Sequence, residues 1–135
     1  MATHTTNYTD TLILPSPDTR AESAVAPPTG RGTVAELQYA RLSAGDYRWT
    51  SDDLLFDVHC ERRQVAEADR AAERESFFSR GQPCLRTSPL AKTYGWAFHF
   101  DPAGRIALLP AGSERVAELE ADPAVTVTRA MRSSR

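Results

Sequence analysis

Lysine is almost absent from this chain of 135 residues, because Lys92 is the single lysine among 16 basic residues and all the others are arginine. One lysine leaves Schiff-base chemistry a single candidate, and no neighbour in the sequence activates its amine. The arginine excess is typical of the codon usage of a GC-rich genome. The number of arginines is therefore not by itself evidence that any of them has a functional role. The formal net charge of -2 excludes a strongly basic protein that coats nucleic acid.

Long apolar runs are also missing. Near the N-terminus the longest is Leu12-Ile13-Leu14, far short of the ~20 residues that a membrane-spanning helix needs. The first residues lack the basic and apolar regions of a signal peptide. We therefore expect a cytoplasmic protein, in which the two cysteines, Cys60 and Cys84, are free thiols.

Well-marked catalytic and metal-binding motifs are absent as well. The chain has no CxxC, no HExxH and no cluster of Cys and His, which argues against a zinc site. It has no GxGxxG, no P-loop and no GxSxG. The sequence therefore predicts no metal and no cofactor.

The composition that is present is ordinary for a globular protein, with 41% hydrophobic and 25% charged residues. The length suits one domain over residues 1–135. Hydrophobic periodicity and turn residues predict a strand over 8–14, a Pro- and Gly-rich loop over 15–32, a helix over 33–45, a helix that begins at 50–53 and takes in 54–60, a helix over 67–80, an irregular connector over 81–90, strands over 94–100 and 105–109, a helix over 113–121, a strand over 124–130 and a basic tail over 132–135.

Helix caps carry part of this prediction. Thr33 can cap a helix, and Glu36 three residues later completes a capping-box pattern. The segment 54–60 fits a strand by its alternation and a helix by its apolar stripe, and the cap at 50–53 favours the helix. The acids Asp52 and Asp53 are explained by the positive end of that helix, with a carboxylate pair for acid–base chemistry as the alternative.

The predicted order is β-(α)3-β-β-α-β, which is typical of ferredoxin-like folds. We expect an α+β domain with a four-stranded, antiparallel-rich sheet and helices on one face. Trp96, Phe98 and Phe100 alternate along one strand and predict a face that packs in the core, although the same face could act as a stacking platform.

Two residues are candidates for catalysis. Cys84 lies in a loop beside Arg86, a cation that favours the thiolate, and His99 could act as its base. The competing interpretation makes Cys84 a packing residue and His99 a structural residue of the strand. If the two side chains lie on opposite faces of the sheet, the pairing fails.

Charge is distributed unevenly along the chain. Residues 50–80 hold eight acids and five arginines, whereas residues 81–135 hold seven basic and five acidic residues. We therefore expect a non-catalytic domain that binds an anionic small molecule or nucleic acid, and we rank this above an enzyme or redox sensor built on Cys84 and His99. Homo-oligomers are possible. The candidate binding residues are Arg86, Tyr94, Trp96, Arg105, Arg129 and Arg132.

Several motifs in order resemble a family of small uncharacterised bacterial proteins, domain of unknown function 6157. They are His4-Thr5-Thr6-Asn7-Tyr8, the segment from Tyr47 to Phe56, Phe77-Phe78-Ser79-x-Gly81-Gln82-Pro83-Cys84, Ser88-Pro89-Leu90, Tyr94-Gly95-Trp96, His99, Ile106-Ala107-Leu108 and Ala130-Met131-Arg132-Ser133. The chain departs from the family at Gln64-Val65-Ala66, where members tend to have Gly-Ile-Ser. The resemblance implies a compact intracellular domain and brings no activity, cofactor or catalytic residue.

Overall fold

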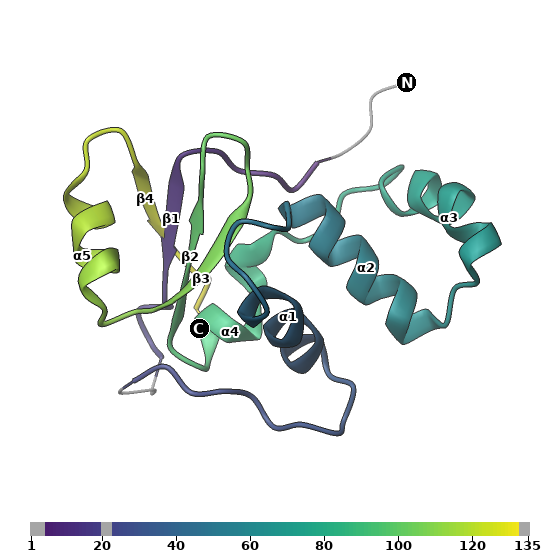
Figure 1. Ribbon diagram of the computed structural model, residues 1–135, viewed down its shortest axis with the longest axis horizontal. Coiled ribbons are helices and arrows are strands. Elements are labelled where there is room, and N and C mark those ends of the chain that lie inside the picture. Colours follow the sequence, from purple (N-terminus) through teal and green to yellow (C-terminus); the bar gives the residue numbers. More distant parts are fainter. Residues whose placement is uncertain (1–4, 20–22, 133–135) are drawn as a thin grey trace.

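The computed structural model describes residues 5–19 and 23–132, and these form a single α+β domain with a four-stranded sheet, as predicted (Figure 1). The elements in chain order are β1 (Thr11–Leu14), α1 (Val34–Ser43), α2 (Ser51–Arg63), the 3-10 turn η1 (Glu67–Asp69), α3 (Arg70–Phe77), the 3-10 turn η2 (Leu85–Thr87), α4 (Pro89–Lys92), β2 (Trp96–Phe100), β3 (Ile106–Pro110), α5 (Glu114–Ala121) and β4 (Thr126–Arg129).

The predicted helix starts are confirmed by their caps. The hydroxyls of Thr33, Thr50 and Ser113 each accept a backbone N–H in the first turn of the helix that follows. The ambiguous segment 54–60 is helical and lies inside α2. The predicted capping box is only half formed. Thr33 caps the helix, but the Glu36 carboxylate accepts the N–H groups of residues 30–32 instead of the N–H of Thr33.

The segment 81–90, expected to be an irregular connector, contains η2 and the first two residues of α4. Ser88 begins α4 by accepting the N–H of Leu90, and Pro89 occupies the first helical position, where its missing N–H costs nothing. The Pro- and Gly-rich loop holds no regular element between Leu14 and Val34 in the part of it that is described. Of the predicted tail 132–135, all but Arg132 lies outside the described residues.

The sheet has the order β3-β2-β1-β4 and is mixed. β2 is antiparallel to both β1 and β3, whereas β4 is parallel to β1. A ferredoxin-like split βαβ unit separates its two parallel strands by another strand. Here β1 and β2 are adjacent and antiparallel, so the strand order differs from the predicted ferredoxin-like sheet.

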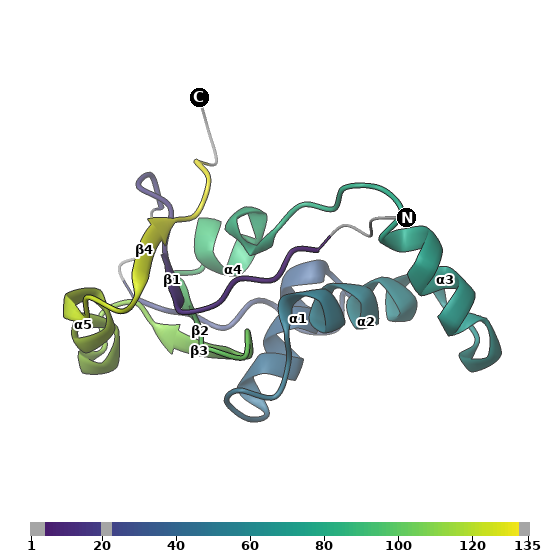
Figure 2. The ribbon, with the colours of Figure 1, turned by 90° about the horizontal axis from the view of Figure 1, so that it is seen from above.

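The expectation of helices on one face of the sheet is wrong for α5. One face carries Ile13, Phe98 and Phe100 and packs against α1, α2 and α4. The other face carries Leu12 and Ala97, with further residues of the sheet, and packs against α5. Figure 2 shows the sheet between α5 on one side and α1 and α4 on the other. This double cover explains why all four residues of β1 are buried.

Helix α3 lies on the far side of α2 from the sheet (Figure 1). Phe56, Cys60 and Phe78 form a small apolar cluster there, distinct from the two layers on the sheet. Among the described residues, no helix is long and apolar enough to cross a membrane.

Candidate functional site

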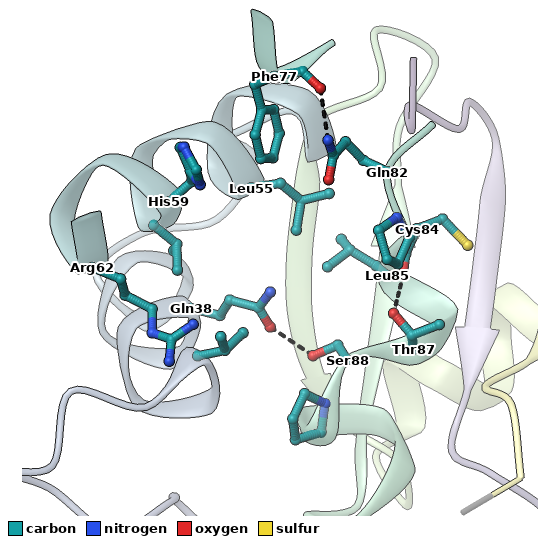
Figure 3. Close-up of a pocket in the computed structure, with 14 residues that line it drawn as sticks. Gln38, Leu55, His59, Arg62, Phe77, Gln82, Cys84, Leu85, Thr87 and Ser88 are labelled. Carbon is teal, nitrogen blue, oxygen red and sulfur yellow. Dashed lines mark hydrogen bonds between the residues drawn. The ribbon is translucent and has the colours of Figure 1, made fainter. Parts of the chain in front are cut away.

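A pocket of about 220 Å³ lies between helices α1 and α2 and the segment 82–89 that precedes β2 (Figure 3). Its volume is just below the range of roughly 300–1,000 Å³ that is common for ligand pockets. Most of the lining is apolar, and a few polar side chains converge on it. The apolar lining residues are Val34, Leu55, Val58, Phe77, Pro83, Leu85 and Pro89.

Helical spacing explains which residues reach the pocket. On α1, Val34 and Gln38 are one turn apart and lie on one face. On α2, Leu55, His59 and Arg62 follow the same three- and four-residue spacing. The two helices therefore present one stripe each to the segment 82–89.

Gln38 is the most deeply buried polar group of the pocket, with 2% of its surface exposed. Its Oε1 accepts the hydroxyl of Ser88 at 2.6 Å, and that hydroxyl in turn accepts the N–H of Leu90. These bonds orient the amide so that its NH₂ group faces the pocket (Figure 3). Within the described ranges, this NH₂ group donates to no protein acceptor, and no buried side-chain nitrogen or oxygen lacks a partner there, so the NH₂ group is open to the pocket and available to a ligand.

Three further polar side chains surround this donor. The guanidinium of Arg62 extends along the rim toward Gln38 (Figure 3) and forms no ion pair with any residue that the structure describes. The Nε2 of His59 lies 2.7 Å from a carboxylate oxygen of Glu73. Gln82 donates its amide N–H to the carbonyl of Phe77 at 2.6 Å, which leaves its Oε1 facing the pocket.

Cys84 borders the pocket, but its sulfur points away from the cavity (Figure 3). The Tyr8 hydroxyl donates a hydrogen bond to this sulfur at 3.2 Å. Burial, together with this hydrogen bond and the charge of Cys84, raises the pKa of Tyr8 to about 12, against a smaller opposing effect of Arg86. The Tyr8 ring packs on Phe100, with centroids 5.2 Å apart, so Cys84 lies on the α1 and α4 side of the sheet.

His99 lies on the opposite side of the sheet from Cys84. It pairs with Leu12 across β1 and β2, so its side chain shares the α5 face. Its Nδ1 lies 2.7 Å from the hydroxyl of Tyr47. Burial, and then the charge of Arg115, lower its pKa. The predicted pairing of Cys84 with His99 is therefore wrong, since the sheet separates the two side chains.

The predicted arginine face is also divided. Arg86 donates through Nε to the carbonyl of Arg129 at 2.7 Å, and its own carbonyl accepts the N–H of Met131. Arg129 lies beside Leu14 at one end of the sheet. Arg105 precedes β3 at the opposite end.

The remaining predicted binding residues do not converge on a common site either. The Trp96 ring packs against Tyr39, with centroids 5.5 Å apart, and its indole N–H donates to the carbonyl of Val25. Tyr94 packs against the large core cluster, and Arg132 is exposed beyond β4. The aromatic face is thus core packing, as the sequence favoured.

Sequence reasoning missed Gln38, His59 and Arg62. A signal was available for Gln38, because Val34, Gln38 and Leu42 repeat every fourth residue and place one amide on an otherwise apolar helix face. No such signal marks Arg62, whose position at the end of α2 also suits the negative end of the helix. Within the described residues, no group of His, Cys, Asp and Glu could hold a metal ion.

Fold and site together define an α+β protein with a small, mainly apolar pocket and a few convergent donors. The chain belongs to the family of unknown function DUF6157, whose sequence model matches residues 3–135. Neither a curated protein nor a solved structure matches the chain.

Proposed function

We propose that this protein binds a small organic acid, whose carboxylate is held by Gln38 and Arg62 and whose apolar part fills the pocket. The proposal rests on the NH₂ group of Gln38, which is open to a mainly apolar pocket and donates to no acceptor among the described residues. A ligand that supplies an acceptor gains a hydrogen bond to this donor, and a charged acceptor gains about 1.5–3 kcal/mol.

An anionic acceptor is favoured over a neutral one by Arg62. Its guanidinium lies at the rim beside Gln38 without a carboxylate partner among the described residues. Two donors, one from α1 and one from α2, suit the two oxygens of a carboxylate. The small volume favours a ligand below the size of a typical drug.

The test compares hexanoate with its neutral analogue hexanamide, by following the backbone amide resonances of the ¹⁵N-labelled full chain. We expect hexanoate to shift the resonances of residues around the pocket and to bind more tightly than hexanamide. Gln38→Met and Arg62→Met should each weaken hexanoate binding roughly tenfold, the loss of one charge-assisted hydrogen bond. Equal binding of the two probes, or shifts confined to other surfaces, would contradict the proposal.

A matched control is Arg115→Met, which removes an arginine from α5 on the other face of the sheet. This variant should bind hexanoate as the natural chain does. If Arg115→Met weakens binding as much as Arg62→Met, the effect of Arg62 is one of total charge, and its assignment to this pocket is wrong.

The proposal includes a cytoplasmic, bacterial setting. The two free thiols, Cys60 and Cys84, support the cytoplasm, where disulfides are rare. The arginine-rich composition supports a GC-rich bacterial genome.

A further inference from the structure

A second depression adjoins the pocket and shares part of its wall. Its volume is about 390 Å³, and three of its lining residues, His59, Phe77 and Gln82, also line the first pocket. The remaining lining is polar and includes Arg63 and Arg80. An apolar pocket therefore meets a polar one along a common wall.

The polar depression has uncompensated positive charge. Arg63 and Arg80 are exposed, and neither forms an ion pair with any residue in the described ranges. The one carboxylate of the lining belongs to Glu73, and it is held by His59 at 2.7 Å. Ser76 adds a hydroxyl to the lining. Two free guanidinium groups beside a hydroxyl suit an anion with several oxygens.

We infer that the ligand carries a second anionic group, a carboxylate or a phosphate, which Arg63 and Arg80 bind in this polar depression. The inference rests on the proposed function, since the first carboxylate occupies the pocket at Gln38 and Arg62. The apolar middle of the ligand then runs along Phe77, which lines both depressions. The ligand class is a short dianion with one anionic group at each end.

The test uses matched probes on the full chain: hexanoate, adipate and 5-phosphonopentanoate, and the longer series of octanoate, suberate and 7-phosphonoheptanoate. Adipate and suberate have as many carbons as their monoacids and carry a carboxylate in place of the terminal methyl group. The phosphonates replace this second carboxylate, so the three arms separate the two kinds of anion. Affinities are measured by the same amide shifts, which also report whether residues near Arg80 respond.

We expect at least one dianion to bind roughly tenfold more tightly than the monoacid of the same chain. The double variant Arg63→Gln/Arg80→Gln should abolish this gain and leave monoacid affinity unchanged. A dianion that gains nothing over its monoacid overturns the inference, as does a gain that persists in the double variant. Arg115→Gln is the matched control and should keep the gain.

The two proposals fail in different ways. If hexanoate binds at Gln38 and Arg62 while no dianion gains affinity, only the second anionic subsite is wrong. If neither monoacids nor dianions shift the pocket residues, the proposed function and the subsite are both wrong. If dianions bind only near Arg63 and Arg80 and ignore Gln38→Met, the pocket is not the ligand site.

Discussion

The hydroxyl of Tyr8 donates a hydrogen bond to the sulfur of Cys84 across 3.2 Å, although 76 positions separate the two residues in sequence. This bond joins the segment before β1 to the loop before η2. It also turns the sulfur away from the pocket, so the only cysteine near the site is engaged in holding the fold together.

The Tyr8–Cys84 contact predicts an unusually high pKa for the Tyr8 hydroxyl. Burial and the neighbouring sulfur raise the pKa of Tyr8 to about 12. An absorbance titration of the tyrosinate in the natural chain, minus that of Tyr8→Phe, isolates this group. We expect this difference in tyrosinate absorbance to have its midpoint near pH 12. The midpoint should move toward pH 10 when the natural residue is replaced in Cys84→Ala. A difference centred near 10 in the natural chain would contradict the assignment.

Because of His99, we expect the folded protein to lose stability in mild acid. Its pKa in the folded chain lies below the ordinary value of 6.5, because burial and Arg115 oppose the charged form. The unfolded chain therefore takes up the proton first. The contribution of His99 to folding is complete above about pH 6.5 and is lost as the pH falls through its folded pKa.

Urea unfolding of the natural chain and of His99→Gln measures this effect. Glutamine can keep a hydrogen bond with Tyr47 but does not titrate. We expect the natural chain to lose more unfolding free energy than His99→Gln between pH 7.5 and 5.5, on the ordinary titration range of histidine. Parallel losses in the two proteins would show that His99 is not the group responsible.

Asp57 links three helices, so we expect its removal to lower the free energy of unfolding substantially. It accepts hydrogen bonds at 2.7 Å from both Arg41 on α1 and Arg70 on α3. Asp57→Ala leaves the guanidinium of Arg41, which is 15% exposed, with Glu61 as its one carboxylate partner among the described residues and with the carbonyl of Leu37. We expect a loss of about 2 kcal/mol in unfolding free energy, measured by urea denaturation.

The control for Asp57 is Glu67→Ala, whose carboxylate is 94% exposed and lies 3.9 Å from Arg70. A pair this exposed contributes little, and we expect a change within about 0.5 kcal/mol. Burial raises the pKa of Asp57, but hydrogen bonds from Arg70 and Arg41 lower it overall. Its stabilisation is therefore present above the ordinary aspartate pKa and lost as the pH falls below it.

Glu36 predicts local order in the loop before α1. Its carboxylate accepts the N–H groups of Gly30, Arg31 and Gly32 at 2.7–3.0 Å, and these bonds, chiefly those from the two glycines, lower its pKa. We expect Glu36→Ala to speed hydrogen exchange of these three amides, without a matching change in β1. Unchanged exchange at Gly30 and Gly32 would contradict the contact.

Local features of the fold were predictable because they are encoded within a few residues. Helix starts are predictable from capping side chains, which here belong to Thr33, Thr50 and Ser113. The alternation of Trp96, Phe98 and Phe100 likewise predicts that they share one face of the sheet. The mixed sheet was not predictable in this way. The position of β4 beside β1 depends on the side of the sheet over which α5 crosses. No short sequence pattern predicts that side.

The candidate site shows the same limit. Strand alternation correctly places His99 on the face opposite Phe98, but it does not tell over which face the loop of Cys84 lies. Gln38 acquires its role from Ser88, a residue 50 positions away that fixes its amide. The donors of the pocket are therefore a product of tertiary packing.

The position of β1 has a consequence for how the chain assembles during synthesis. Thr11 pairs with Phe100 on one side and with Thr126 on the other, so both partners of this first strand are made after most of the chain. At synthesis rates of about 5–20 residues per second, the apolar run Leu12-Ile13-Leu14 waits unpaired for seconds. The nascent chain therefore carries an apolar strand without its partners for longer than any other strand of the sheet, and unpaired apolar segments of this kind favour aggregation.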